Sequence, residues 1–243
     1  MSIILWDKKY TETLAVTLER FRKENLEYAH SKITYAGRLD PMAEGLLLLL
    51  TDKDVHKKQK FLSLDKVYEV DFILGVSTDT YDVLGLITQN SLSVAINEEC
   101  VQNIVNSFLK IQEQEYPPYS SKTVKGKALW EYTRAGITPN NIPVKNIVIS
   151  KSDYIGCTNI KNLKNDILYS VDSVKGDFRQ KDIISQWEKY FITHQNENIY
   201  TMRVQASSGT YMRSLVHSLG KELGIGATTL KIRRKKIGEY KLT

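Results

Sequence analysis

The sequence has 243 residues, 42% hydrophobic and 26% charged, as is ordinary for a soluble globular protein with one large domain or two small ones. No run of about 18 apolar residues occurs and the N-terminus lacks a signal-peptide pattern, so we expect neither a membrane span nor a secretory leader. Two cysteines and four histidines show no metal-ligand spacing, which fits a metal-free protein of the reducing cytoplasm. The net charge of +6 leans modestly toward an anionic partner.

The first half of the chain mixes predicted strands and helices. Five leucines at 46–50 predict a short strand that is buried on both faces. Residues 67–75 alternate apolar and polar side chains, which indicates a half-buried strand. The predicted elements here are strands at 3–6, 46–50, 67–75 and 86–88, and helices over about 12–24 and after the capping residue Asn97.

The second half continues the mixture, with its weakest patterning at about 158–196. Ile167, Tyr169 and Val171 lie at alternate positions, which favours a strand over 166–174. The other predicted elements are a helix at 129–134, strands at 144–156 and 200–206, a helical stripe at 183–191, and a helix from about 210 to Gly224. Because strands and helices do not alternate strictly, we predict an α+β fold with a largely antiparallel sheet.

Two clusters of cations stand out. Lys231–Lys236 holds five cations in six residues, and Lys122–Lys127 holds three lysines close to aromatic residues. Basic residues with aromatic neighbours suit a phosphate backbone and stacked bases. For each cluster alone, a solvated surface is the alternative.

Three side chains are candidates for chemistry. Asp40 lies in a turn just before the leucine strand, where it is either a turn residue or a catalytic carboxylate with Arg38 as a near partner. Arg213 lies in the first turn of a predicted helix, against the helix dipole, which hints at a role beyond that helix or is an ordinary surface arginine. Tyr68 shares a strand face with apolar residues, which alone favours a core position.

Five segments, in order, resemble the TruB-type pseudouridine synthases, the family that makes pseudouridine 55 in the T-arm of tRNA. These segments are Gly37–Leu46 (GRLDPMAEGL), Lys66–Glu69 (KVYE), Leu74–Gly85 (LGVSTDTYDVLG), Pro117–Lys127 (PPYSSKTVKGK), and Ser208–Leu215 (SGTYMRSL) continuing to Arg234. The resemblance covers about 200 residues and implies a pseudouridine synthase fold, with a central mixed, mostly antiparallel sheet flanked by helices.

The resemblance implies a role for each matching residue. Asp40 matches the family's catalytic aspartate, and Arg213 matches the arginine that pairs with it. Tyr68 matches the tyrosine that stacks on the flipped base. Among the binding residues, Ile232 matches an apolar floor beneath the base, Asp79 an acid of the rim, and Tyr211 an aromatic residue near the pocket.

The chain also departs from the family pattern. Tyr35 stands where bacterial members usually have histidine, and Arg38 where many have a small residue or threonine, a trait shared with rRNA pseudouridine synthases. Residues 158–196 look like an insertion. We expect a single catalytic domain over 1–243, with an RNA-binding loop and helix at about 116–140 and no room for the family's C-terminal PUA domain.

The resulting expectation is a cytoplasmic, monomeric tRNA pseudouridine synthase that needs no cofactor, metal or membrane. The alternatives are an rRNA pseudouridine synthase and a tRNA-binding RNA chaperone. Besides Tyr35, Arg38, Asp79, Tyr211 and Ile232, the residues expected to contact RNA are Lys122, Lys125, Lys127, Arg233, Arg234, Lys235 and Lys236.

Overall fold

The computed structural model describes residues 3–91, 96–160, 162–194 and 198–242. Its strands are β1 Ile3–Lys8, β2 Ile33–Ala36, β3 Ala43–Thr51, β4 Lys66–Leu74, β5 Val76–Thr78, β6 Ile87–Asn90, β7 Glu113–Glu115, β8 Thr123–Val124, β9 Lys127–Ala128, β10 Val144–Asn146, β11 Ile149–Asn159, β12 Asn198–Ala206, β13 Ala227–Ile237 and β14 Tyr240–Lys241. Its α-helices are α1 Leu14–Glu24, α2 Lys58–Leu62, α3 Glu98–Ser107, α4 Leu129–Arg134, α5 Leu163–Ser173, α6 Gln180–Thr193 and α7 Met212–Glu222. Short 3₁₀ helices cover Leu26–Tyr28, Asp52–Lys57 and Phe108–Lys110.

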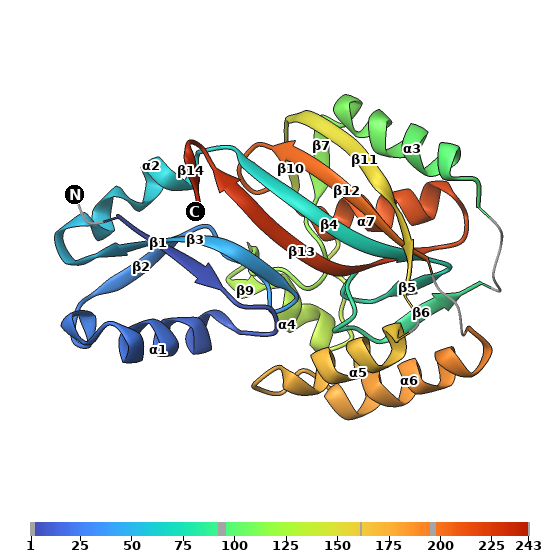
Figure 1. Cartoon of the computed structure of the whole chain (residues 1–243), viewed down its shortest axis with the longest axis horizontal. Helices are drawn as coiled ribbons and strands as arrows, with labels where there is room; N and C mark the ends of the chain where they lie inside the picture. The colour runs from blue at the N-terminus through green and yellow to red at the C-terminus, as the bar shows by residue number, and fades with distance from the viewer. Residues whose placement is uncertain (1–2, 92–95, 161, 195–197, 243) are drawn as a thin grey trace.

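One eight-stranded sheet organises the molecule. Its order is β1-β3-β13-β4-β12-β11, with β2 paired to β3 and β14 paired to β13. Within this sheet, β3 and β13 run parallel and the other pairs are antiparallel. Helices flank the sheet, with α3 and α7 behind it and α5 and α6 along its lower edge (Figure 1). This confirms the predicted α+β class.

The leucine strand lies at the centre of one half of the sheet, in β3. Its five leucines, residues 46–50, are fully buried. Leu47 and Leu49 pack with Phe21 of α1, whereas Leu46, Leu48 and Leu50 pack with Phe61 on the opposite face. Strand alternation therefore supplies two core clusters at once, as the sequence predicted.

The predicted strand 67–75 is β4, and its two faces differ as expected. Val70 and Phe72 are buried in the core beneath α3 and α7, whereas Glu69 and Asp71 point to the other face of the sheet. The predicted cap is also present, because the side chain of Asn97 accepts a hydrogen bond from Glu99 N at the start of α3.

Two sequence predictions need correction. Residues 163–173 form α5, not a strand: Leu163, Ile167 and Val171 recur at helical spacing and are buried, whereas Tyr169 is 75% exposed. The predicted strand 144–156 is two strands, because β10 pairs with β7 and β11 pairs with β12.

The proposed insertion 158–196 contains the α5–α6 helical hairpin; residues 161 and 195–196 of this segment lie outside the described residues. Trp187 is fully buried in a core cluster that joins the hairpin to Ile73 of β4 and to Val83. Its indole nitrogen donates to Val83 O at 3.1 Å. The hairpin is therefore an integral part of the packed fold.

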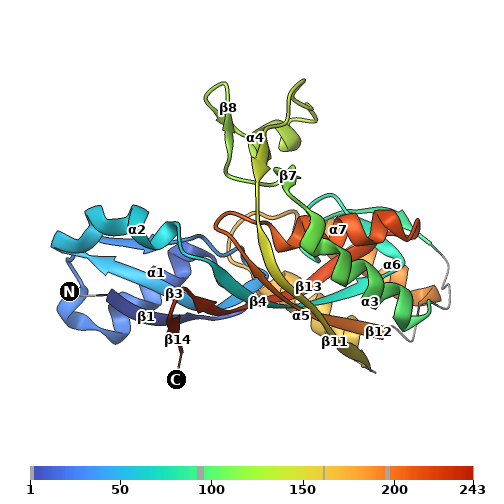
Figure 2. The ribbon, with the colours of Figure 1, turned by 90° about the horizontal axis from the view of Figure 1, so that it is seen from above.

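Residues 116–140, here called the arm, leave the body after β7 and return through β10. They carry the β8–β9 pair and α4, and Figure 2 shows them standing away from the sheet on the side of α3 and α7. Among the described residues, no helix is long and apolar enough to cross a membrane.

Candidate active site

A cleft of about 1080 Å³ lies between the sheet, the arm and the connection from α5 to α6. The loop between β2 and β3 supplies Asp40, β4 supplies Tyr68, β13 supplies Ile232 and α7 supplies Arg213. The arm contributes Tyr119 and other residues to the opposite wall. Segments far apart in the sequence thus converge on one concave site, as binding and catalytic sites commonly require.

Asp40 and Arg213 form the ion pair at the centre of this cleft. Nε and Nη2 of Arg213 each lie 2.8 Å from Oδ2 of Asp40. The arginine side chain is 4% exposed, whereas the aspartate side chain is 31% exposed and faces the cleft. Arg38, the neighbour in sequence, turns away and donates to Ser121 Oγ at 2.7 Å. The predicted pairing of Asp40 with Arg213 is present.

Further contacts fix the buried guanidinium. Arg213 donates to the carbonyl oxygens of Thr80 and Tyr119, and its Nε lies 3.6 Å from Oδ2 of Asp82. Burial alone would lower the pKa of Arg213, but Asp40 and Asp82 outweigh burial and raise it, so this arginine stays charged. A buried cation whose donors are satisfied in this way can hold a carboxylate in a fixed orientation.

Burial dominates the titration of Asp82. It raises the pKa of this carboxyl to about 6, although Arg213 and a hydrogen bond from Thr80 oppose the shift. Leu84 N also donates to Asp82 Oδ1, at 3.0 Å. Arg213 therefore lies between an accessible carboxylate on one side and a buried one on the other.

The wall and floor of the cleft are aromatic and apolar. Tyr68 is half-buried and lines the cleft while packing against the core beneath α7. Ile232 lines it from the adjacent strand β13. Tyr211, at the start of α7, lies edge-on to Tyr116 of the arm with ring centroids 5.7 Å apart. These surfaces suit a planar ring held by stacking and apolar contact.

Asp79 is placed differently from the expectation of a rim acid. Its carboxylate receives two hydrogen bonds from Arg179, at 2.6 and 3.2 Å, and one from Leu86 N at 2.9 Å. Arg179, not Asp79, is among the residues that line the cleft.

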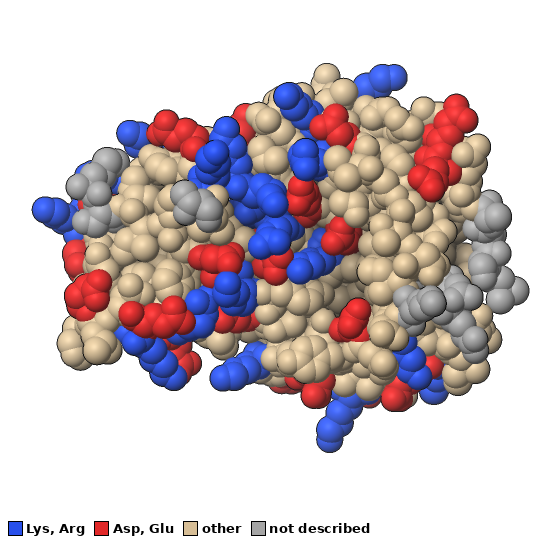
Figure 3. Space-filling model, viewed as in Figure 1, with Lys and Arg blue, Asp and Glu red and all other residues tan. Residues whose placement is uncertain are grey.

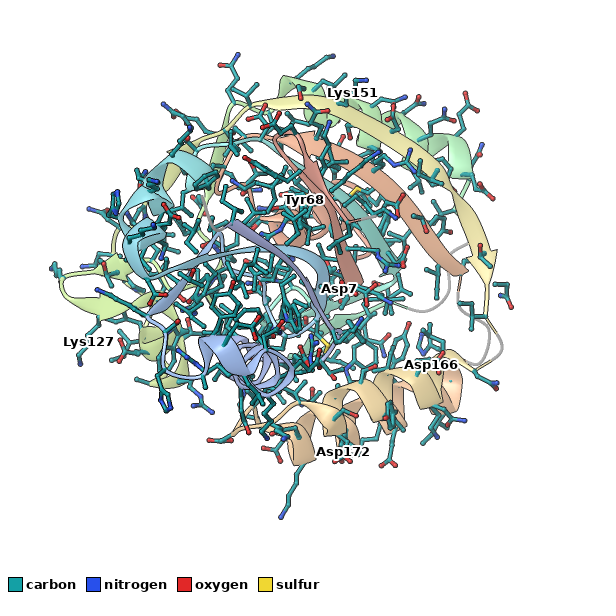
Figure 4. All side chains as sticks on the ribbon, turned by 60° about the vertical axis from the view of Figure 1, so that its left-hand side comes forward. Asp7, Tyr68, Lys127, Lys151, Asp166 and Asp172 are labelled. Atoms are coloured by element: carbon teal, nitrogen blue, oxygen red, sulfur yellow. The ribbon has the colours of Figure 1, made fainter. Side chains whose placement is uncertain are left out.

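The cations of the arm lie at and beyond the mouth of the cleft. Lys122 lines the cleft, with Nζ 5.2 Å from the centroid of the Tyr116 ring. Lys125 and Lys127 are exposed around the β8–β9 turn, and Figure 4 shows Lys127 at the outer end of the arm. On the facing side, Tyr35 lines the cleft beneath Lys58, whose Nζ is 5.2 Å from the Tyr35 ring centroid.

The basic run Lys231–Lys236, which includes four of the cations expected to contact RNA, is divided between two faces of the sheet and so does not line the cleft as a whole. Ile232 and Arg234 face the cleft, but Lys231 and Arg233 pair with Glu44, and Lys235 pairs with Glu69, on the opposite face. Figure 3 shows lysine and arginine side chains gathered with acids over the middle of that face. Lys236 is exposed after a register shift and does not line the cleft.

Arg234 is a buried anchor for the loop that carries Asp40. It is 1% exposed and donates to the carbonyl oxygens of Leu46 at 2.7 Å, Gly37 at 3.1 Å and Arg38 at 3.5 Å. Gly37 has φ +89°, and a Cβ there would lie 3.3 Å from Nη1 of Arg234. A glycine is needed because the backbone is left-handed and the arginine is close.

A family model described as "TruB family pseudouridylate synthase (N terminal domain)" matches residues 23–178. The chain belongs to the TruB family. The tRNA pseudouridine synthase B of Blochmanniella floridana is 30% identical over 238 residues, which cover 98% of this chain and 76% of that protein. That of Aquifex aeolicus is 30% identical over 236 residues, covering 97% of this chain and 68% of that protein.

Solved structures support the fold of this TruB family member. The chain aligns with a chain of a Cbf5-Nop10-Gar1 complex at a TM-score of 0.59 and 17% identity, covering 99% of this chain and 50% of the other. It also aligns with a chain of an H/ACA RNP bound to a substrate RNA containing 2'-deoxyuridine, at a TM-score of 0.57 and 16% identity, covering 99% of this chain and 49% of the other. The chain thus spans about half the length of these solved chains, and the likeness confirms the predicted pseudouridine synthase fold.

Sequence reasoning missed several residues of this TruB site. Asp82 stands three positions after Asp79 in the same motif, so the motif's second carboxylate was an available signal. Lys66 opens the KVYE motif; its buried ammonium donates to the Leu62 and Leu64 carbonyls, and burial lowers its pKa to about 8. Arg179 lies in the weakly patterned segment and had no local signal. Within the described residues, no group of three His, Cys, Asp or Glu side chains could hold a metal ion.

Proposed function

We propose that this protein isomerises uridine to pseudouridine in tRNA and that its target is uridine 55 in the T-arm loop. One observation carries the proposal: the Asp40 carboxylate, held by the buried Arg213, faces a cleft walled by Tyr68 and floored by Ile232. Membership of the TruB family and the tRNA pseudouridine synthase B relatives support it.

The geometry suits an isomerisation on a flipped base. A folded loop hides its uracil, so the nucleotide must swing out to reach Asp40, and Tyr68 offers a face on which the base stacks. Asp40 attacks the nucleotide and the C–N glycosidic bond breaks. The uracil then turns and bonds to the sugar through C5, and the bond between Asp40 and the nucleotide breaks, which restores the free carboxylate. The C5 proton leaves and N1 gains one, so atoms balance without an external reactant.

Within this proposal, Arg213 and Tyr68 have distinct tasks. Arg213 orients Asp40 through two contacts to Oδ2, because its guanidinium is itself fixed by carbonyl groups of the body and the arm. Tyr68 orients the base and is the candidate acceptor for the C5 proton. Asp40, Tyr68 and Arg213 meet within a single chain, which supports a monomeric enzyme.

The decisive experiment measures tritium release from 5-labelled uridine in a T-arm stem-loop transcript. Asp40→Asn keeps the size of the side chain but removes the nucleophile, so we expect turnover to fall by at least about a thousandfold. RNA affinity should change little. The matched control is Asp166→Asn, an exposed aspartate on α5 that lies far from Tyr68 in Figure 4.

Other outcomes would revise distinct parts of the proposal. Turnover retained by Asp40→Asn would remove the nucleophile assignment. Isomerisation of an rRNA fragment without isomerisation of the T-arm would keep the chemistry and change the substrate. Binding of tRNA by the unmodified protein without any tritium release would instead support an RNA chaperone.

A further inference from the structure

The connection between α5 and α6, residues 174–179, is a tight turn that forms part of the cleft wall. Gln180 closes this turn: its Nε2 donates to the carbonyls of Val174 at 2.9 Å and Gly176 at 2.8 Å, and its Oε1 accepts from Phe178 N at 2.9 Å. Asp177, Phe178 and Arg179 all line the cleft. The turn is thus internally bonded and presents its last residue to the site.

Arg179 bridges the body and the arm. Its guanidinium makes the two hydrogen bonds to Asp79 of the body and lies 4.9 Å from the ring centroid of Tyr119 of the arm. The residue has φ +63°, a left-handed backbone conformation that is unfavourable for residues other than glycine. Such a conformation persists where surrounding contacts hold it, and it often marks a functional position.

A second contact between the arm and the α5–α6 turn uses an arginine of the arm and an aspartate of the turn. Arg134 of α4, in the arm, donates to the carbonyl oxygen of Asp177 at 2.9 Å and to its carboxylate at 3.0 Å. The arm is therefore joined to the α5–α6 turn twice, by the contact of Arg179 with the Tyr119 ring and by the ion pair of Arg134 with Asp177.

Tyr119, which Arg179 contacts, is connected to the reacting carboxylate of Asp40 through Arg213. The carbonyl oxygen of Tyr119 accepts a hydrogen bond from Nη2 of Arg213 at 3.2 Å, and the same nitrogen lies 2.8 Å from Oδ2 of Asp40. A displacement of Tyr119 would remove one of the acceptors that orient Arg213. Small displacements of such groups are costly because catalysis depends on aligned reacting atoms.

We propose that Arg179 is a positioning residue for the isomerisation: it clamps Tyr119 against Asp79 and so keeps Arg213 aligned with Asp40. The proposal rests on the proposed function of the cleft. It assigns to the α5–α6 hairpin a task in the reaction, although the hairpin carries none of the five family motifs. The rival role for Arg179 is a contact with an RNA phosphate, which would affect affinity and not the chemical step.

The test compares single-turnover kinetics on the T-arm stem-loop. Arg179→Met removes the charge and the planar fork but keeps an extended side chain, and Arg179→Lys restores only the charge. Lys181→Met is the matched control, because Lys181 is an exposed cation of the same hairpin outside the cleft. We expect the rate constant at saturating RNA to fall by about tenfold or more in Arg179→Met, with partial recovery in Arg179→Lys. The dissociation constant should change by less than about threefold.

A double variant checks the route of the effect. If Arg179 acts by holding Asp79 and Tyr119 together, Arg179→Met combined with Asp79→Asn should lose little more than Arg179→Met alone. A weaker dissociation constant with an unchanged rate at saturation would overturn the proposal in favour of a phosphate contact. Unchanged values of both would also overturn it.

Hydrogen exchange supplies a readout that does not depend on activity. In Arg179→Met, amides of residues 116–134 should exchange at least about threefold faster, while those of α5 and α6 keep their protection. Unchanged exchange in the arm would overturn the clamp even if the unmodified protein proved inactive on this RNA. Inactivity of the unmodified protein and of Lys181→Met would count against the proposed function instead.

Discussion

At the residue scale, the site is built around one buried cation between two carboxylates. Asp40 is accessible and bonded to Arg213, whereas Asp82 is buried and lies 3.6 Å from the same guanidinium. Because burial raises the pKa of Asp82 to about 6, this carboxyl is neutral in acid and anionic at neutral pH. Once anionic, it shares the charge of Arg213 and leaves Asp40 less neutralised, and thus a better nucleophile.

The pH dependence of Asp82→Asn tests this arrangement. The single-turnover rate of the unmodified protein should rise as the pH increases through about 6, where Asp82 loses its proton. Asp82→Asn should lack that rise and be slower by about tenfold near pH 8. Single-turnover rates of both proteins, measured from about pH 5 to pH 8, test this prediction, with Asp166→Asn as the control. Superimposable profiles for Asp82→Asn and the unmodified protein would contradict the prediction.

At the element scale, strands hold the Asp40 loop from two sides. Lys8 ends β1, is fully buried, and donates to the carbonyl of Ala43 at 2.5 Å and to that of Pro41 at 3.5 Å. Arg234 of β13 holds the other end of the loop through the Gly37 and Arg38 carbonyls. The position of the proposed nucleophile is therefore set by two buried cations that belong to the scaffold.

Lys8 should make stability depend on pH in the alkaline range. Burial lowers its pKa from 10.5 to about 8, so between these values the unfolded chain binds more protons than the folded one. The free energy of unfolding should therefore gain up to about 3 kcal/mol from Lys8 as the pH rises from about 8 to 10.5. Denaturant titrations should show a smaller rise for Lys8→Met. Equal rises in both proteins would show that the ammonium is not destabilised by burial.

At the scale of the whole molecule, the two basic clusters lie in different electrostatic settings. Lys122, Lys125 and Lys127 stand on the arm at and beyond the mouth of the cleft. The cations of β13 that face away from the cleft are paired with Glu44 and Glu69. Among the residues that the structure describes, the three lysines of the arm form no ion pair, so the arm offers unneutralised charge to RNA, whereas the outer face largely balances its own charge.

Salt dependence of tRNA affinity separates the two clusters. Replacing Lys122, Lys125 and Lys127 by Gln should weaken binding and reduce the slope of log affinity against log salt by about 2 between about 50 and 200 mM. Replacing Lys231, Arg233 and Lys235 by Gln is the matched control and should leave the slope near that of the unmodified protein. The prediction fails if the outer-face variant loses more slope, or if affinity is flat with salt.

Local sequence patterns were enough to predict those elements whose buried residues recur with a single helical or strand period. The leucine strand, the alternating β4, the Asn97 cap and the stripe of α7 were all predictable, because each depends on residues within a few positions of one another. For α5 the pattern was ambiguous: Ile167 and Val171 fit a strand with Tyr169 between them, or a helix with Leu163 before them. Packing against α6 and the sheet selects the helix.

The partners of Asp40 and Asp79 are set by contacts between residues far apart in the sequence. Motif resemblance alone pointed from Asp40 to Arg213, 173 residues away, and no pattern pointed from Asp79 to Arg179, 100 residues away. Composition and periodicity describe which faces of an element are buried. Sheet register and helix packing decide which elements meet, and so which charges share a low-dielectric site. That is why the chain's chemistry could be anticipated from its motifs, while the clamp at Arg179 and the division of the β13 cations between two faces appear only in the folded protein.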